Sequence, residues 1–439
     1  MLFLYSIALS LAFILMLPLF VLRRAKYAAG FSQRLGNYPR FDHDGRPVIW
    51  IHCVSVGETN AARPLVNALK QRFPLHRLIV STTTKTGQEL ATKIFAEKAE
   101  AVFYFPFDWK FSVKRALERY KPAAVLLMET EIWPRFISEA KLSGAKVAIV
   151  NGRLSNRSTG RYSLARRFIG SVLDDVDLAL MQGGNDAERI IGLGCKRSLV
   201  TGNLKFDLDL ENDDDAITEE LDSRFGFTSS GRPLIVAAST HDPEERFVLD
   251  AFCSTAAGSQ TIKPRLLIAP RHPERFDQVA KTVREFSNGP ACEFPGFKTA
   301  RRSDGISPDH ADSDIIILDS IGELRAVYPL AEIVFVGGSI IPHGGQSILE
   351  PAAAGKAIIT GHHTHNFEDA VHAFLDSGAI IQLPDKDGEQ IVDELFISFV
   401  DLLENDDERR SLGLNAAAVM NANRGATRRT IDALIEILK

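Results

Sequence analysis

Glu58 follows a glycine at the end of the first apolar stretch after the N-terminal segment, residues 49–58. A helical pattern begins directly afterwards, which places this carboxylate at the N-terminus of an expected helix. The helix dipole there favours the ionised form, which suits a general base near neutral pH. The alternative is an ordinary acidic residue in a first helical turn. We therefore take Glu58 as the leading candidate for a catalytic base.

Two further carboxylates, Glu129 and Glu131, end the apolar stretch of residues 123–131. On an extended chain, side chains two residues apart point the same way. Holding two carboxylates near each other is costly, which favours a functional role. The structural alternative is an ion pair of one of them with Arg135 or Arg153.

A glycine-rich segment, residues 337–361, follows another apolar stretch. Its first glycines, including Gly338, allow a sharp turn. Free backbone N–H groups and the start of a helix expected near Ser347 would together form a phosphate cradle. Glu350, about one turn into that helix, would reach the hydroxyls of a ribose. A simple turn without a ligand is the alternative. The residues expected at the cradle are His343, Gly344 and Gly345.

Basic and polar residues occur at further strand ends. Arginine binds phosphate and carboxylate groups in a bidentate manner. The basic motifs contribute Arg271, His272, Arg275, Asn203 and Lys205. A strand end in the second half contributes Ser239, Thr240 and His241, which could contact a phosphate or a nucleobase.

Apolar stretches and helical segments alternate in both halves of the chain. This alternation is typical of parallel strands with crossover helices. We therefore expect an α/β fold of two Rossmann-like, doubly wound domains with a crevice between them and ligands at the carboxyl ends of the strands. The expected parts are a membrane helix (1–24), a first domain (25–210), a linker (211–231), a second domain (232–420) and a C-terminal helix (421–439).

Residues 1–22 contain no charged side chain, and Arg23, Arg24 and Lys26 follow at once. As a helix this segment would reach about 33 Å, enough to cross a bilayer. The order of charge is the reverse of that in a signal peptide. The positive-inside rule then places the rest of the chain in the cytoplasm. A buried helix, or one lying on the membrane surface, is the alternative.

Composition narrows the functional classes. The net charge of −5 gives no general attraction to nucleic acid. The four cysteines have no C-x-x-C spacing, which argues against a zinc site and against a disulfide framework. We expect neither a metal nor another cofactor.

Six motifs, taken together and in this order, resemble the 3-deoxy-D-manno-octulosonic acid (Kdo) transferases of Gram-negative bacteria. They are VSVGE from Val54, METEIWP from Met128, NGRLSNRS from Asn151, GNLKFD from Gly202, APRHPERF from Ala269 and the glycine-rich segment from Gly337. The resemblance implies a GT-B fold with the acceptor domain first and the nucleotide-sugar domain second.

The resemblance also implies the reaction. Kdo would pass with inversion, and without a metal, from CMP-Kdo to a lipid A precursor (lipid IVA) at the cytoplasmic side of the inner membrane. Glu58 matches the family's base and Glu129 a second acidic residue. The implied donor residues are Arg271, His272, Asn203, Lys205, Ser239, Thr240, Gly338, His343, Gly344, Gly345, Ser347 and Glu350, and the implied acceptor-side residues are Glu131, Arg135 and Arg153.

Other functions fit parts of the same pattern. A GT-B enzyme that uses a UDP-sugar on a lipid carrier would have a similar glycine-rich helix, as would a nucleotide-sugar epimerase. A membrane-tethered binding protein that keeps the sugar-nucleotide fold without turnover belongs to a different class. Competition by CMP against UDP separates the first two from a Kdo transferase.

Overall fold

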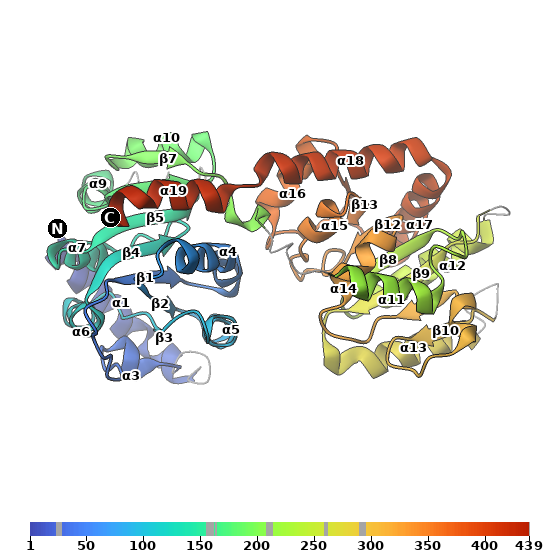
Figure 1. Cartoon of the computed structure of the whole chain (residues 1–439), viewed down its shortest axis with the longest axis horizontal. Helices are drawn as coiled ribbons and strands as arrows, with labels where there is room; N and C mark the ends of the chain where they lie inside the picture. Colours follow the sequence, from blue (N-terminus) through green and yellow to red (C-terminus); the bar gives the residue numbers. More distant parts are fainter. Residues whose placement is uncertain are drawn as a thin grey trace. The chain divides into compact units, whose positions relative to one another are not determined.

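The computed structural model describes residues 1–22, 29–154, 162, 165–207, 214–258, 262–288 and 296–438. The chain divides into two compact units (Figure 1). Unit 1 comprises Met1–Leu208 together with Asn423–Lys439, and unit 2 comprises Asp209–Ala422. Each unit contains one parallel sheet, as the alternation of apolar and helical segments predicts.

The sheet of unit 1 has seven strands in the order β3-β2-β1-β4-β5-β6-β7, and its neighbouring strands pair in parallel. The strand order reverses beside β1, the position at which ligands bind in open α/β sheets. The strands are β1 (Val48–Cys53), β2 (Arg77–Thr82), β3 (Ala101–Tyr104), β4 (Pro122–Met128), β5 (Lys146–Gly152), β6 (Leu178–Met181) and β7 (Ser198–Val200).

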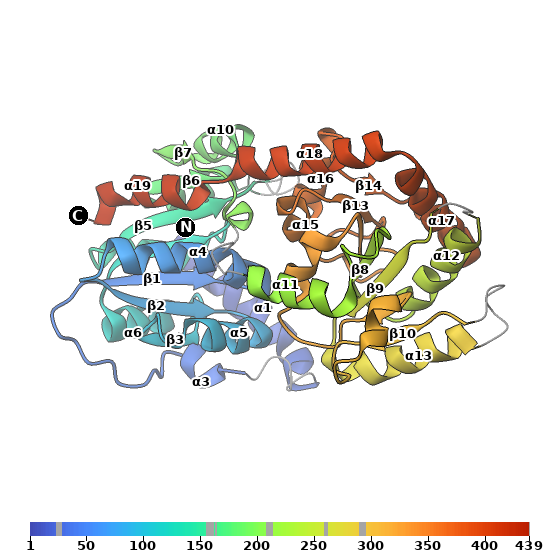
Figure 2. The same ribbon diagram turned by 45° about the vertical axis from the view of Figure 1, so that its right-hand side comes forward.

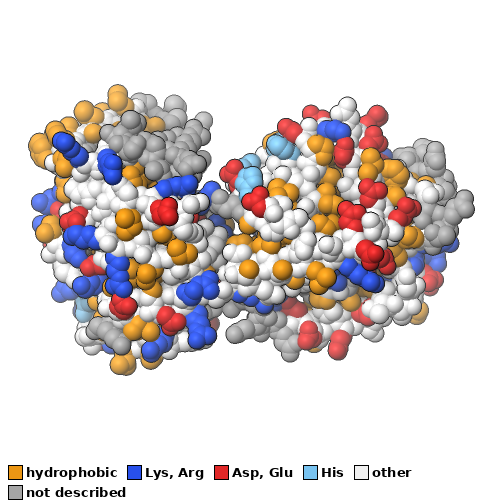
Figure 3. Space-filling model, turned by 90° about the horizontal axis from the view of Figure 1, so that it is seen from above, with side chains coloured by type: hydrophobic (Ala, Val, Ile, Leu, Met, Phe, Trp, Pro, Cys, Tyr) orange, Lys and Arg blue, Asp and Glu red, His pale blue; other side chains and the backbone are white. Residues whose placement is uncertain are grey.

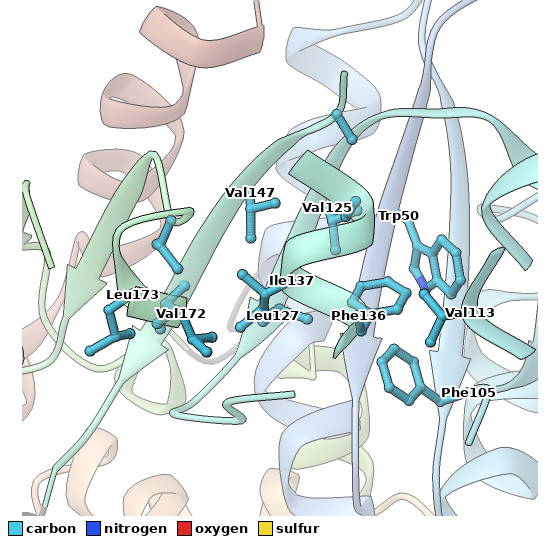
Figure 4. Close-up of a cluster of buried hydrophobic side chains, with 14 of the residues drawn as sticks. Trp50, Phe105, Val113, Val125, Leu127, Phe136, Ile137, Val147, Val172 and Leu173 are labelled. Atoms are coloured by element: carbon cyan, nitrogen blue, oxygen red, sulfur yellow. The ribbon is translucent and has the colours of Figure 1, made fainter. Parts of the chain in front are cut away.

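Side chains of β1 alternate between two hydrophobic clusters, one on each face of this sheet. Trp50 belongs to the cluster drawn in Figure 4, beside Phe105 and Phe136. Ile49 and Ile51 belong to the cluster on the other face. Helices thus cover both faces of the sheet. They are α4 (Val56–Arg72), α5 (Lys85–Phe95), α6 (Lys110–Tyr120), α7 (Pro134–Leu142), α9 (Arg166–Leu173) and α10 (Gly184–Leu193), with the shorter α3 (Phe31–Arg34) and η1 (Leu204–Phe206).

The last helix, α19 (Ala426–Leu438), belongs to unit 1 and not to the domain that precedes it in the chain. Figure 1 shows it in red beside α4 and β5. Its residues Ile431 and Leu434 are buried in the same cluster as Ile49. The Arg429 Nε–H donates to the carbonyl of Thr201 at 2.8 Å. The sequence predicts a terminal helix at 421–439 but not its return to the first domain.

The sheet of unit 2 also has seven strands, in the order β10-β11-β9-β8-β12-β13-β14, and its strands are parallel. The order reverses beside β8, as it does beside β1 in unit 1. The strands are β8 (Leu234–Thr240), β9 (Arg265–Pro270), β10 (Thr299–Arg301), β11 (Ile315–Ile317), β12 (Ile333–Val336), β13 (Ala357–Thr360) and β14 (Ile381–Gln382).

Helix α17 packs against α12, as Figures 1 and 2 show, and both contribute to the core of unit 2. Within the segment expected to be a linker, residues 215–225 form α11, whose Leu221 and Phe225 are buried. The acidic composition of 211–231 concealed this amphipathic helix. The helices are α11 (Asp215–Phe225), α12 (Glu244–Gly258), α13 (Phe276–Asn288), α14 (Leu324–Val327), α15 (Leu349–Ala353), α16 (Glu368–Asp376), α17 (Glu389–Glu404) and α18 (Asp406–Asn423), with η2 (Pro273–Arg275), η3 (Pro308–Asp312) and η4 (Tyr328–Leu330).

The N-terminal segment forms helix α1 (Leu2–Leu22). Its side chains bond to unit 1: the Tyr5 hydroxyl donates to Asp108 at 2.8 Å, and Ser10 accepts from the Trp109 indole at 3.2 Å. Within the described residues, no helix combines the length and the apolarity needed to cross a bilayer. The expected transmembrane anchor is therefore not supported.

Two helical glycines offer a matched test of the packing. A Cβ at Gly413 in α18 would overlap the carbonyl oxygen of Gly355, whereas a Cβ at Gly192 in α10 would meet open space. We expect Gly413→Ala to lower the free energy of unfolding by roughly 1–3 kcal/mol through overpacking. Gly192→Ala should be neutral or should raise it by up to about 1 kcal/mol, because alanine favours the helix. Urea denaturation of both variants measures this; equal effects would contradict the packing of α18.

Candidate active site

Glu58 lies in the first turn of α4, directly after β1. Its carboxylate accepts the Val54 N–H at 2.6 Å and the Ser55 hydroxyl at 3.2 Å. Only 6% of the residue is exposed. The predicted position at a helix N-terminus is therefore confirmed.

The protonation of Glu58 differs from the expectation. Burial raises its pKa to about 8, against the lowering effect of the Val54 N–H, and Glu129 and Glu131 raise it further. Desolvation outweighs the helix N-terminus, so the carboxyl is mostly protonated at neutral pH and becomes a base above it. The group can therefore exchange a proton in the physiological range.

Glu129 follows β4 in the left-handed region, at φ 55°. Because the strand ends at Met128, the extended geometry assumed for Glu129 and Glu131 is absent. Glu129 forms an ion pair with Lys205 at 3.3 Å, a partner that the structural alternative of Arg135 or Arg153 did not include. Burial raises the pKa of Glu131, and the charge of Glu129 raises it further. The left-handed backbone conformation of Glu129 is of a kind that is often found at functional sites.

The other predicted residues of unit 1 have different roles. Arg135 is buried and donates to the Leu2 carbonyl at 2.9 Å and to the Ser6 hydroxyl at 3.0 Å, so it holds α1. The Arg153 N–H donates to the Thr130 hydroxyl at 2.8 Å. Arg135 therefore bonds to the N-terminal helix rather than to Glu129 or Glu131.

Asn203 and Lys205, predicted to bind the donor, lie in unit 1 after β7. The Asn203 side chain accepts the Lys205 N–H at 3.0 Å and caps η1. Asn151, at the end of β5 with φ 57°, accepts the Leu204 N–H at 2.9 Å. This bond fixes the short helix that carries Lys205 toward Glu129.

In unit 2, loops after β8, β9 and β12 bring three histidines together. The ring of His241 lies 4.1 Å from that of His343 and 5.3 Å from that of His272, between centroids. Arg271 donates from Nε to Gln346 at 3.3 Å. The structure thus brings Arg271, His272 and His343, which were predicted at separate strand ends, to the same edge of the sheet.

His241 is only 6% exposed, and neither ring nitrogen has a hydrogen bond of good geometry among the described residues, although Nδ1 lies 3.9 Å from the carboxylate of Glu244. Burial lowers its pKa to about 4, and the neighbouring His343, His272 and Arg271 lower it further. A buried imidazole without a partner is costly unless a ligand satisfies it. Together with the guanidinium of Arg271, the histidines suit an anionic group such as a phosphate.

At the expected phosphate cradle, the His343 N–H donates to the Ile341 carbonyl and the Gly345 N–H to the Gly338 carbonyl, both at 2.7 Å, so neither of these two groups is free. The turn directly after β12, residues 338–340, has a different partner. The N–H groups of Gly338, Ser339 and Ile340 donate to the carboxylate of Glu244, so they are already bonded. The following helix α15 begins at Leu349, later than expected, and has five residues. A glycine-rich string is compatible with either a ligand or an internal acceptor, and here an internal carboxylate takes the N–H groups.

The structure also gives the contacts or backbone conformation of three other predicted residues of unit 2, Thr240, Ser239 and Glu350. Thr240 is fully buried and donates to Glu245 at 2.9 Å. Glu245 in turn holds Arg275 through two bonds, at 2.7 and 3.0 Å. Ser239 has φ 54°. Burial raises the pKa of Glu350, while Arg325 lowers it.

Two further predicted glycines, Gly344 and Gly345, have φ values of 98° and 77°, a region that glycine adopts readily. The hydroxyl of Ser347 accepts the Leu349 N–H at 3.4 Å. Glu244, Glu245 and Gln346 were not predicted as site residues; the acidic pair that follows Ser-Thr-His after two intervening residues was the available signal for the first two.

In the part of the chain that the structure describes, no three His, Cys, Asp or Glu side chains form a group that could hold a metal ion. The cysteines depart from the expectation, because Cys253 is disulfide-bonded while Cys53 and Cys195 are buried free thiols. Spacing along the chain does not determine which sulfurs meet in a folded unit.

Two parallel-sheet α/β units with polar groups at the carboxyl ends of their strands define the architecture of GT-B glycosyltransferases. A solved MurG structure from Acinetobacter baumannii shares this fold, with a TM-score of 0.55 at 13% identity, over 89% of this chain and 99% of that one. UDP-GlcNAc 2-epimerase from Neisseria meningitidis gives a TM-score of 0.54 at 13% identity, over 89% and 100%.

Sequence comparison identifies the family. A profile described as 3-deoxy-D-manno-octulosonic-acid transferase (kdotransferase) matches residues 29–208. The 3-deoxy-D-manno-octulosonic acid transferase of Haemophilus influenzae is 32% identical over 93% of this chain and 91% of its own length. That of Bordetella pertussis is 33% identical over 88% and 86%. The chain belongs to the Kdo transferase family and is a glycosyltransferase of lipopolysaccharide synthesis.

Proposed function

We propose that the enzyme transfers Kdo from CMP-Kdo to a hydroxyl of a lipid A precursor, lipid IVA, with inversion and without a metal ion. The observation that carries this proposal is the buried Glu58 carboxyl, whose pKa of about 8 suits a base for a sugar hydroxyl. Membership of the Kdo transferase family supports the sugar that is transferred.

In the proposed reaction Glu58 accepts the proton of the acceptor hydroxyl. The hydroxyl oxygen forms a bond to the anomeric carbon of Kdo while the bond from that carbon to the CMP phosphate oxygen breaks. CMP leaves with the electron pair of that bond. One displacement from the opposite face inverts the configuration.

Transition-state charge develops on the phosphate, where fixed cations stabilise it most. We assign this task to the guanidinium of Arg271 of unit 2, with the ring N–H groups of His272, His241 and His343 as hydrogen-bond donors. A guanidinium forms charge-assisted bonds to phosphate without help from a metal. Kdo also carries a carboxylate beside its anomeric carbon, which adds a second anionic group to the donor.

The acceptor and the membrane are assigned to unit 1. Its sequence carries 34 Lys and Arg against 19 Asp and Glu, whereas unit 2 carries 17 against 37. Figure 3 shows this contrast on the face that it presents, with blue side chains prevailing over unit 1 and red ones over unit 2. A cationic unit suits a phosphorylated lipid and an anionic membrane surface.

Helix α1 supports a membrane location. Apolar side chains along it are exposed, including Phe3, Leu4, Leu11, Ile14 and Leu15. Its opposite side bonds to unit 1, as Tyr5 and Ser10 show. We propose that this exposed apolar side of α1 lies in the lipid at the surface of a bilayer. We place the enzyme at the cytoplasmic side of the inner membrane.

Glu129→Gln tests the electrostatic coupling within unit 1. The charge of Glu129 contributes to the raised pKa of Glu58, after burial. Removing that charge should lower the pKa of Glu58, so the acidic limb of the pH–rate profile moves to lower pH. The surface variant Glu89→Gln on α5 should leave the limb in place. An unchanged limb in Glu129→Gln would show that the charge of Glu129 does not affect the pKa of Glu58.

The experiment that tests the function is the release of CMP from CMP-Kdo by the full chain, with and without a tetra-acylated lipid A precursor, in the presence of EDTA. We expect acceptor-dependent release that survives EDTA. Consumption of UDP-sugars would instead indicate a transferase or epimerase with another donor. Thermal stabilisation by CMP with no turnover would indicate a binding protein.

A further inference from the structure

Glu244 occupies an unusual position at the start of α12. The side chain is fully buried, and its carboxylate accepts four backbone N–H groups. One comes from His241 in the preceding loop, at 3.0 Å. The others come from Gly338, Ser339 and Ile340, at 2.6, 3.0 and 3.2 Å. A buried carboxylate is costly unless it is hydrogen-bonded, and these four donors satisfy both of its oxygens.

The turn that Glu244 holds begins the loop that carries His343. The carbonyl of Gly338 accepts the N–H of Gly345 at 2.7 Å, so the two ends of this loop are joined. Between them, the ring of His343 lies 4.1 Å from that of His241. The same carboxylate therefore fixes the backbone of His241 and one end of the loop that presents His343.

The packing around this carboxylate leaves no spare room. A Cβ at Gly337 would approach Glu244 Oε2 and the Cα of Thr240, both at 2.8 Å. A Cβ at Gly338 would lie 3.3 Å from the ring of His241. A shift of the turn would therefore move the histidines that face the proposed phosphate position.

We infer that Glu244 is a positioning residue for the donor site: by bonding to the turn after β12 it holds His343 against His241, and it keeps the N–H groups of residues 338–340 from binding a phosphate. This inference rests on the proposed donor site in unit 2. The phosphate of the donor then contacts side chains, Arg271 and the histidines, and not the amides of the glycine-rich turn.

Glu244→Gln tests the inference in the full chain. An amide keeps one acceptor oxygen but turns an N–H₂ group toward N–H donors, so part of the set is lost. We expect the KM for CMP-Kdo to rise by roughly tenfold or more, since these bonds involve a charged group. Glu244→Asp keeps the charge with a shorter reach and should give a smaller rise. The KM for the lipid acceptor should not change in either variant.

Asp314→Asn is the matched control. Asp314 accepts the Lys298 N–H at 2.9 Å and bonds to Arg232 at 2.7 Å, and it precedes β11, at the amino-terminal edge of the same sheet. This variant should change thermal stability without changing the KM for CMP-Kdo. If Glu244→Gln and Glu244→Asp, once folded, also leave that KM unchanged, Glu244 is merely structural and the inference is overturned.

Hydrogen exchange of the unmodified enzyme gives a test that needs no variant. The amides of residues 338–340 should exchange slowly without a ligand and change little when CMP is added. Fast exchange that CMP then slows would show that the amides bind the phosphate, and would overturn the inference. Because this measurement requires no turnover, failure of the proposed transfer reaction remains distinguishable from failure of the role of Glu244.

Discussion

Glu58→Gln should lower kcat by about 10²–10⁴-fold, the usual contribution of a general base. The variant keeps the size of the side chain but cannot accept a proton. The affinity for CMP should stay the same, because the groups proposed to bind its phosphate, Arg271 and the three histidines, lie in unit 2. Initial rates of Kdo transfer, with CMP binding measured by calorimetry, separate the two effects. Near-normal turnover would exclude Glu58 as the base.

The pH dependence of kcat/KM tests the role of Glu58 in a second way. With a pKa of about 8, the base form of Glu58 increases as the pH rises through 8, so kcat/KM should rise through that range. This limb should be absent from the residual activity of Glu58→Gln.

Stability should change in the opposite sense. The pKa in the folded state lies above the ordinary value of 4.5, so between those two values the folded protein binds a proton that the unfolded chain has released. Stability contributed by this group is therefore lost as the pH rises toward 8. Glu58→Gln should be the more stable protein at pH 8 and above, which thermal melts across pH would detect. General structural damage would lower the stability instead.

Asp177→Asn serves as the control for Glu58→Gln. Asp177 accepts the Val147 N–H at 2.9 Å and bonds to Lys141 at 2.6 Å. It lies at the amino-terminal edge of the sheet of unit 1, whereas Glu58 lies at the carboxyl edge. The control should lose stability while kcat stays near that of the unmodified enzyme.

Arg271→Ala should raise the KM for CMP-Kdo, and the Kd for CMP, by roughly 10–100-fold through loss of charge-assisted bonds to the phosphate. Arg271→Lys should give an intermediate value, because an ammonium cannot bind in a bidentate manner. Arg246→Ala is the matched control, since Arg246 bonds to Asp250 on the outside of α12. CMP affinity in Arg271→Ala within twofold of the unmodified enzyme would place the phosphate elsewhere.

The alternation of apolar stretches predicts two parallel sheets because parallel strands are buried on both faces and therefore mostly apolar, as β1 is with every residue buried. The same pattern places Glu58, Glu129, Arg271 and His272 at strand ends, where the structure has them. What a pattern along the chain does not encode is a contact between distant segments. The return of α19 to unit 1 is one such contact, and the pairing of Lys205 with Glu129 is another.

The protonation state of Glu58 and the hydrogen bonding of the turn after β12 could not be predicted from the sequence either. The helix N-terminus at Glu58 was predictable, but the balance between its field and burial depends on the atoms that surround the carboxylate in the folded state. The glycines after β12 similarly indicate a tight turn without indicating its hydrogen-bond acceptor. That acceptor, Glu244, lies 94 residues earlier in the chain than Gly338.

The most direct test of the central proposal is the structure of the lipid product formed by the full-length enzyme from CMP-Kdo and a tetra-acylated lipid A precursor in the presence of EDTA. Mass spectrometry should show the addition of at least one Kdo residue with release of an equal amount of CMP, and NMR should show an anomeric configuration opposite to that of the donor. An unchanged lipid, retention of the donor's configuration, or a reaction abolished by EDTA and restored by a metal ion would contradict the account.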